Sequence, residues 1–251
     1  MDVSNKIIQS FWYGDQLTQI EQLSIKSFLA NGHEFHLYTY NPDLLGVPKE
    51  CIIKDASAII PSSKVFFDNR GIIASFSDYF RIQLLYKKGG WWVDLDIVCL
   101  HPFDFDTDYC FSSEYVQNKP FPNIGCIKCP RHSDFLDDYL RVIEKYLSSY
   151  KVVNWGVFGP KLMHDLLQQY DSSDYVQPPE TFIMPRILYS KSLTLVFDNL
   201  FKEFTRDAII SGLEESHSVH LYNELWRLLG IDKTKKFPKN SLLEYLNQLY
   251  L

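Results

Sequence analysis

The stretch GGWWVDLD, at residues 89–96, decides how this chain folds. Its two glycines end a helical pattern that covers residues 73–88, because glycine directly after an amphipathic run is typical of a helix C-terminus. The residues that follow are apolar or favour β-structure, apart from two aspartates. We therefore predict a helix over residues 73–88 and then a strand over residues 91–100, which Asp94 and Asp96 interrupt.

The same alternation of strand and helix occurs upstream. A β-favouring run at residues 6–13 ends in a turn signal, apolar residues recur at helical spacing over residues 17–29, and residues 33–40 form a second β-favouring run. Strand, helix and strand in this order are the unit of a parallel sheet. Further elements are predicted downstream: helices over 133–149 and 159–170, a proline-rich loop over 171–190 and a short amphipathic helix over 241–251.

These patterns predict a single α/β domain with a less regular C-terminal part. We place the domain at residues 1–230 and a basic, amphipathic tail at residues 231–251. The tail can either dock on the domain or contact an anionic membrane surface, since lysines precede its apolar residues.

Composition excludes several classes of protein. With 46% hydrophobic and 22% charged residues, the chain reads as folded rather than disordered. A net charge of −6 without a dominant basic face argues against a nucleic-acid partner. There is no run of about 18 apolar residues and no export-signal pattern, and the five cysteines are sparse and odd in number. We expect a cytoplasmic protein with reduced thiols.

Asp94 and Asp96 are the strongest chemical signal. In a strand, residues i and i+2 share a face, so both carboxylates are predicted to project together. Two unpaired carboxylates in an apolar strand are costly to desolvate, and a bound Mg²⁺ or Mn²⁺ would offset that cost. Such an ion is commonly completed by phosphate oxygens, which implies a phosphorylated substrate. Alternatively, one aspartate caps a turn and the other pairs with a lysine or arginine.

Asp78 and Arg81 form a second signal just upstream. At i and i+3 of the predicted helix they lie on one face. They can form a surface ion pair of little energetic value, or they can hold hydroxyl groups and a phosphate of the same ligand.

Residues 74–81 and 85–96 together resemble the signature of the glycosyltransferases with a DXD sugar-binding region, of the family 32-like type. This group includes α-1,4-galactosyltransferases and enzymes of capsular polysaccharide synthesis, and it is similar to the glucosylating domain of large clostridial toxins. Residues 6–14 resemble its opening strand, and residues 219–226 resemble its C-terminal His-Leu-Trp-Asn motif with Tyr222 in place of the usual tryptophan. The resemblance covers roughly residues 6–226.

The resemblance implies a GT-A fold, which is Rossmann-like and binds nucleotide-sugars, and a retaining transfer that needs Mn²⁺ or Mg²⁺. By this match Asp96 binds the metal, His220 is a further metal or diphosphate contact, and Asp78, Asp94 and Asp96 are catalytic. Trp12 would stack on the base and Trp92 would sit beside the nucleotide. The implied donor contacts are Phe11, Trp12, Ser77, Asp78, Arg81, Trp92, Asp94, Asn223 and Trp226, and the implied acceptor side comprises Asn123 and Gly159.

The resemblance therefore predicts transfer of a hexose from a UDP-sugar to a glycan or lipid-linked acceptor in bacterial surface polysaccharide synthesis, with galactose as the sugar. Its setting would be the cytoplasm, with peripheral contact at the inner face of the plasma membrane through the tail. The alternatives are a GDP-mannose-dependent mannosyltransferase, a metal-dependent phosphoryl-transfer enzyme and a non-catalytic carbohydrate-binding protein.

Overall fold

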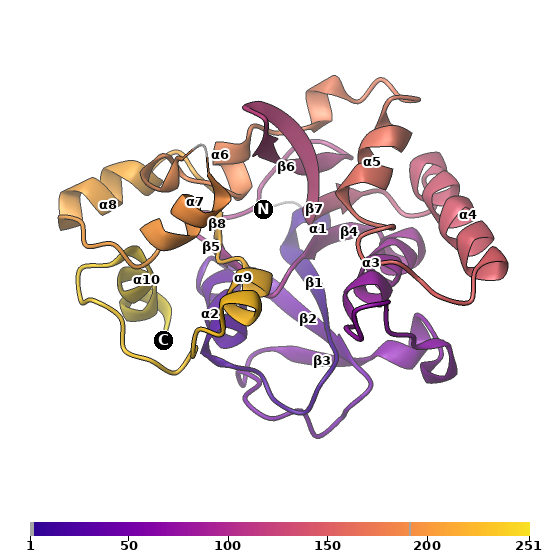
Figure 1. The fold of residues 1–251 in the computed structure, drawn as a ribbon, viewed down its shortest axis with the longest axis horizontal. Helices are drawn as coiled ribbons and strands as arrows, with labels where there is room; N and C mark the ends of the chain where they lie inside the picture. Colours follow the sequence, from indigo (N-terminus) through magenta and orange to yellow (C-terminus); the bar gives the residue numbers. More distant parts are fainter. Residues whose placement is uncertain (1–2, 191) are drawn as a thin grey trace.

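A six-stranded sheet in the order β3-β2-β1-β4-β7-β6 forms the centre of the computed structural model, which describes residues 3–190 and 192–251 (Figure 1). The first four strands of this order are parallel, and β7 runs antiparallel to both of its neighbours. The prediction of an α/β, Rossmann-like fold is confirmed, and the arrangement is consistent with the GT-A fold. The strands are β1 (Ile7–Trp12), β2 (Glu34–Thr39), β3 (Ile52–Asp55), β4 (Gly90–Val93), β6 (Cys110–Val116) and β7 (Lys119–Cys129).

Helices cover both faces of the sheet, and each face has its own apolar cluster. Successive side chains of a strand point to opposite faces. Ile8 of β1 therefore belongs to the cluster under α2 (Gln19–Ala30), whereas Phe11 belongs to the cluster under α3 (Ala74–Lys88). Two further helices, α4 (Asp134–Ser149) and α5 (Pro160–Leu167), complete the α3 side. The helices predicted around residues 17–29, 73–88 and 133–149 are thus confirmed.

The end of α3 requires glycine. Gly89 has a φ of +67°, and a Cβ built on it would lie 2.7 Å from the backbone nitrogen of Arg131. A side chain at this position would therefore be strained and would push the chain away from β7. The glycine lets the chain turn sharply from α3 into β4, which places α3 beside the acidic residues that follow that strand.

The predicted strand over residues 91–100 is wrong as a single element. The chain leaves the sheet after β4 and forms a separate strand, β5 (Ile97–Cys99), which pairs antiparallel with β8 (Ser218–His220). Asp94 and Asp96 lie in the break between the two strands. They therefore do not share one face of a continuous strand, because the backbone changes direction between them.

The C-terminal part consists of short helices, which confirms the prediction of a less regular region. The predicted loop over residues 171–190 itself contains single helical turns. The remaining helices are α1 (Val3–Lys6), α6 (Pro179–Phe182), α7 (Leu193–Asn199), α8 (Arg206–Leu213), α9 (Asn223–Leu229) and α10 (Leu242–Tyr250), with 3₁₀ turns at Ala56–Ala58, Ser62–Lys64, Ser173–Tyr175 and Arg186–Leu188.

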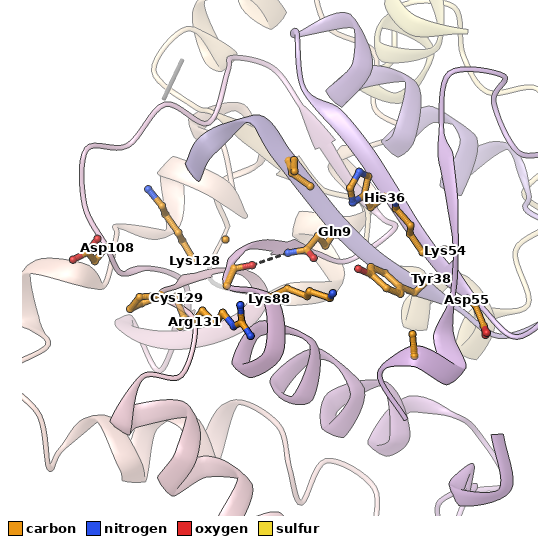
Figure 2. A pocket seen from close by; sticks show the side chains of 15 residues that line it. Gln9, His36, Tyr38, Lys54, Asp55, Lys88, Asp108, Lys128, Cys129 and Arg131 are labelled. Carbon is orange, nitrogen blue, oxygen red and sulfur yellow. Dashed lines mark hydrogen bonds between the residues drawn. The ribbon is translucent and has the colours of Figure 1, made fainter. Parts of the chain in front are cut away.

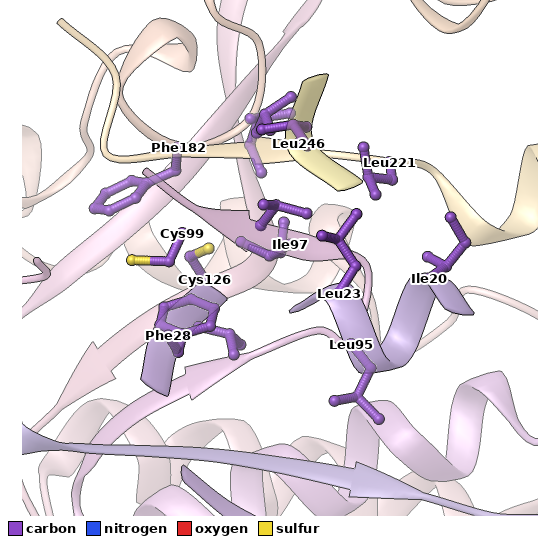
Figure 3. Close-up of a cluster of buried hydrophobic side chains, with 14 of the residues drawn as sticks. Ile20, Leu23, Phe28, Leu95, Ile97, Cys99, Cys126, Phe182, Leu221 and Leu246 are labelled. Carbon is purple, nitrogen blue, oxygen red and sulfur yellow. The ribbon is translucent and has the colours of Figure 1, made fainter. Parts of the chain in front are cut away.

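The tail helix α10 packs against α2. Leu242, Leu243 and Leu246 are buried in the same cluster as Leu23 and Phe28 of α2 (Figure 3). Its apolar face is therefore occupied by the protein, and the structure gives no support to membrane contact through this helix. Within the described residues no helix is long and apolar enough to cross a bilayer. The division of the chain at residues 230 and 231 stays a prediction.

Candidate active site

Asp94 follows β4 directly and is held by two neighbours. Arg81 of α3 lies 2.9 Å from Asp94 Oδ1, and the Trp92 indole donates a hydrogen bond to the same oxygen at 2.9 Å. The backbone N–H of Asp94 donates to Gly125 of β7. These contacts fix the Oδ1 oxygen of Asp94. The other oxygen, Oδ2, faces Gly125 of β7, and a Cβ built on that glycine would lie 3.5 Å from it.

Arg81 joins this aspartate to a second one. Its guanidinium also lies 3.3 Å from Asp78 Oδ1, donates to the carbonyl oxygen of Ile124, and sits over the Trp92 ring. The Arg81 side chain is only 4% exposed, so the ion pairs lie in a region of low dielectric. We conclude that Arg81 orients the two carboxylates and is itself covered by the protein.

Asp96 is held by different residues from a distant part of the chain. Its Oδ2 accepts a hydrogen bond from the backbone N–H of Asn223 at 2.6 Å and lies 3.1 Å from His220 Nε2. His220 comes from β8, which pairs with β5 in the register Ile97 to His220. Tyr222, with a φ of +54°, turns the chain into α9 so that the first N–H of that helix faces Asp96.

The two aspartates of the motif have opposite electrostatic environments. Burial raises the pKa of Asp94, and the attraction of Arg81 does not fully offset this. Burial also acts to raise the pKa of Asp96, but His220 and the N–H of Asn223 outweigh it and hold that pKa below its usual value. Asp96 is therefore ionised at neutral pH, and in turn it raises the pKa of His220 despite the burial of the imidazole.

Asp78, the third carboxyl of the group, also has a raised pKa. Burial raises its pKa to about 6, against the attraction of Arg81 and with the repulsion of Asp94. The group therefore changes charge within one pH unit of neutrality. Buried carboxyls with such values are common at catalytic sites, although structural ion pairs also produce them.

Glu21 and Lys233 were not predicted, yet they support Asn223. Glu21 Oε1 accepts hydrogen bonds from Asn223 Nδ2 and Lys233 Nζ, each at 2.9 Å, and the Glu21 side chain is fully buried. Glu21 also accepts from Thr18 as part of the capping box that begins α2. The only sequence signal was this capping pattern, which explains Glu21 without any role at the site.

Comparison with known families gives one match at this place. Residues 24–115 match the family model described as a glycosyltransferase sugar-binding region containing a DXD motif. This segment is similar to a glycosyltransferase sugar-binding region. Asp78, Arg81 and the DXD aspartates lie inside it, whereas His220 and Asn223 lie outside the matched residues. The match supports a transferase.

Solved structures resemble the chain weakly. The PaToxG glycosyltransferase covers 85% of this chain and 88% of its own, with 16% identity and a TM-score of 0.49. The apo-form glycosyltransferase GlyE of Streptococcus pneumoniae TIGR4 covers 98% of this chain and 63% of its own, with 11% identity and a TM-score of 0.47. A comparison with curated proteins finds no match. The functional argument therefore rests on the sugar-binding region and on the geometry around it.

Asn123 and Gly159, predicted for the acceptor side, lie near Asp94 and Asp78, and the remaining predicted residues can be placed on their elements. Gly159 borders Asp78, since a Cβ built on the glycine would lie 3.6 Å from Asp78 Oδ2. Asn123 accepts a hydrogen bond from the N–H of Gly125, beside Asp94. Ser77 lies on α3 directly before Asp78. Trp12 ends β1, and its buried indole N–H has no partner among the described residues.

Two predicted donor contacts lie in the core instead. Phe11 stacks on Phe80 with ring centroids 4.3 Å apart, beneath α3. Trp226 is buried among phenylalanines, and its indole N–H donates to the carbonyl oxygen of Leu221. Both rings are used in packing, so we do not carry them into the proposed donor site. Core and stacking positions favour the same residue types, so the sequence alone does not distinguish them, and a donor contact at Phe11 or Trp226 stays a prediction.

The donor set around Asp96 fits a divalent cation. Asp96 is an ionised carboxylate, and the two residues that contact it each carry a further buried polar atom, Asn223 Oδ1 and His220 Nδ1, that has no hydrogen-bond partner among the described residues. Among the described residues no three histidine, cysteine, aspartate or glutamate side chains are grouped so that they could hold a metal ion by themselves, so water and substrate would have to supply further ligands. An open set of this kind suits Mg²⁺ or Mn²⁺, which complete their coordination with water and substrate phosphates.

Proposed function

We propose that the protein is a metal-dependent, retaining glycosyltransferase that takes a hexose from a nucleotide-sugar. The observation that carries this proposal is the division of labour between the DXD carboxylates. Asp96 is ionised and is contacted by His220 and Asn223, which carry unpartnered polar atoms, whereas Asp94 pairs with Arg81, which also pairs with Asp78. One side of the motif is suited to a cation and diphosphate, and the other to sugar hydroxyl groups.

Each group then has a defined task. Asp96, with His220 and Asn223, would hold Mn²⁺ or Mg²⁺, which stabilises negative charge on the diphosphate leaving group. Asp78 and Asp94 would accept hydrogen bonds from donor hydroxyls, and Arg81 fixes their orientation. Trp92 places its indole N–H on Asp94 and thereby helps to aim that carboxylate. Asn123 and Gly159 border this side and are proposed to face the acceptor.

Retention of configuration at the sugar can arise in two ways, and they differ in whether a carboxylate of the protein acts as nucleophile. A double displacement would need a carboxylate close to the anomeric carbon. Asp78 and Asp94 are both engaged by Arg81, so neither is a free nucleophile in this arrangement. We propose attack by the acceptor hydroxyl on the face from which the diphosphate leaves, with Asp78 helping to orient the sugar ring.

We further propose UDP-galactose as the donor and a glycan or lipid-linked sugar as the acceptor. The support for galactose is the resemblance of residues 219–226 to the α-1,4-galactosyltransferase motif. Synthesis of a bacterial surface polysaccharide is the setting in which such a transfer would serve. A GDP-mannose donor is the alternative that the same site would also accommodate.

A thermal-shift panel tests the proposal. UDP, GDP, UDP-galactose, UDP-glucose and GDP-mannose are each added with and without Mn²⁺, since a ligand that binds the native state raises the melting temperature. We expect a Mn²⁺-dependent increase with UDP compounds. Asp96→Asn should abolish the Mn²⁺-dependent part, whereas the control Asp165→Asn, which removes a surface pair with Lys161, should retain it.

Other outcomes of the thermal-shift panel would change the proposed donor or the proposed function. A shift with GDP-mannose alone would replace UDP-galactose as the proposed donor. No shift with any nucleotide, in a protein that unfolds cooperatively, would overturn the transferase proposal and favour a carbohydrate-binding protein. Release of free hexose or transfer to a glycan by the intact chain, lost in Asp96→Asn, would complete the case.

A further inference from the structure

A second pocket lies on the sheet, away from the acidic site. It has a volume of about 600 Å³, within the usual range for small-molecule sites. It borders the first residues of β1 and β4, whereas Asp94 and Asp96 follow the last residue of β4. None of Asp78, Arg81, Asp94, Asp96 or His220 lines it.

The lining of this pocket is basic. Four cationic side chains, those of Lys54, Lys88, Lys128 and Arg131, face two carboxylates, those of Asp55 and Asp108 (Figure 2). Among the described residues Lys54, Lys88 and Arg131 form no ion pair with a carboxylate. We call this site the basic pocket. An anion that entered it could approach Lys54, Lys88 and Arg131 without displacing a carboxylate from them.

A tyrosine hydroxyl also faces the basic pocket. The Tyr38 ring is buried, and its hydroxyl has no hydrogen bond to the protein among the described residues. The hydroxyl can therefore donate a hydrogen bond to a ligand or accept one from it. Figure 2 shows the Tyr38 hydroxyl and the Lys88 side chain directed into the pocket from different sides. In the sheet Tyr38 is the register partner of Lys54, so both side chains lie on the same face.

Gln9 lines the basic pocket and gives it groups that can bind a polar ligand. The carbonyl oxygens of Gly89 and Trp91 would repel an anion, but Gln9 Nε2 donates to them at 2.8 and 3.3 Å. The Gln9 side chain is itself buried, and its Oε1 accepts no hydrogen bond among the described residues. The pocket therefore offers cations for a phosphate, and a donor and an acceptor for hydroxyl groups.

We propose that the basic pocket binds a small phosphorylated polyol, such as a hexose phosphate. The phosphate would face Lys54, Lys88 and Arg131, and the hydroxyl groups would bind the Tyr38 hydroxyl and Gln9 Oε1. A concave site of this volume suits a small molecule better than a flat membrane surface. The inference stands apart from the proposed transfer reaction, since the two sites share no residue.

Isothermal titration of the intact chain tests this proposal. Glucose 6-phosphate, inorganic phosphate and glucose are titrated in metal-free buffer that contains a chelator. We expect glucose 6-phosphate to bind at one site, phosphate to bind more weakly, and glucose not to bind. The double variant Lys88→Ala, Arg131→Ala should weaken the binding of glucose 6-phosphate about tenfold or more, because it removes two charge-assisted contacts. The matched double variant Lys145→Ala, Lys161→Ala, on α4 and α5, should bind as the parent does.

Tyr38→Phe distinguishes the contribution of the polyol to binding from that of the phosphate. The variant should weaken the binding of glucose 6-phosphate several-fold and leave the affinity for inorganic phosphate unchanged, because only the contact with the polyol is lost. The proposal is overturned if glucose 6-phosphate does not bind, if the double variant at Lys88 and Arg131 binds normally, or if UDP with Mn²⁺ displaces the ligand. Binding to phosphatidylglycerol vesicles without binding of glucose 6-phosphate would assign the surface to membranes and would likewise overturn it.

Discussion

Asp94 and Asp96 are two residues apart, yet they belong to differently built halves of the site. The near half joins Asp94 to Arg81 and Asp78, all from one stretch of about twenty residues. The far half joins Asp96 to His220 and Asn223, more than 120 residues away. The near half has raised carboxyl pKa values and the far half a lowered one. Surroundings, and not residue type, therefore set the direction in which the pKa of each carboxyl is shifted.

Loss of Arg81 is expected to have the largest effect on stability. Arg81→Met would leave Asp78 and Asp94 buried without their shared cation, which typically costs about 3–5 kcal/mol. Urea denaturation at pH 7 measures this loss. The control Arg141→Met removes a guanidinium that is 73% exposed and pairs with Asp137, so it should cost under about 1 kcal/mol. Equal losses in the two variants would mean that Arg81 does not hold the near half together.

The near half could be predicted from the sequence because its parts are close along the chain. Helical spacing places Asp78 and Arg81 on one face, and the double glycine brings that helix to Asp94. What failed was the assumption of one strand through Asp94 and Asp96. Strand propensity does not show where a chain changes sheets, because that depends on β8, which is supplied from far downstream.

The far half was predicted only through resemblance, and its support was missed altogether. A lone His220 is more often a structural residue than a ligand, so no local signal identified it. Glu21 reads as an ordinary capping-box glutamate, which is usually exposed. In the structure the tail segment that carries Lys233 covers Glu21 and makes it a buried acceptor. Such a role depends on tertiary packing and leaves no mark on neighbouring residues.

Glu21→Gln is the next largest expected effect, and it tests the far half. The amide has only one accepting oxygen, so it cannot bond Thr18 through the other position as the carboxylate does, and it lacks the charge that pairs with Lys233; we therefore expect a loss of about 2–3 kcal/mol in unfolding free energy. Because Asn223 donates to Asp96, the variant should also weaken the Mn²⁺-dependent thermal shift. The exposed Glu144→Gln serves as the control. A stability loss with an unchanged Mn²⁺ response would show that Glu21 supports the fold and not the site.

The two halves should respond to pH in opposite directions. Asp78 has a folded pKa of about 6 against an unfolded value of 3.8, so the native state binds more protons and stability falls as pH rises from about 4 to 6. Asp96 has a lowered pKa, so its contribution is present above pH 3.8 and is lost as pH falls through its folded pKa.

Variants of the two aspartates make that contrast measurable. Asp78→Asn should remove about 1–2 kcal/mol of the decline in unfolding free energy between pH 4 and 7. Asp96→Asn should leave that decline in place and reduce the loss of stability below pH 4. Guanidinium titrations at several pH values provide the curves, with Asp165→Asn as the surface control. Parallel curves for the two variants would contradict the opposite environments assigned here.

Lys233→Met is expected to have the smallest effect, and it asks how far the tail belongs to the site. The Lys233 side chain is 20% exposed, so water can take its place beside Glu21 while Asn223 stays bonded to that carboxylate. We expect a loss of about 1 kcal/mol, well below that of Glu21→Gln, and a largely retained Mn²⁺ response. The control Lys239→Met should be neutral. If instead Lys233→Met matches Glu21→Gln in both readouts, and the double variant is no worse than either single one, then the lysine is an essential part of the far half. In that case Asp96 would be positioned by a chain of contacts that begins in the C-terminal tail.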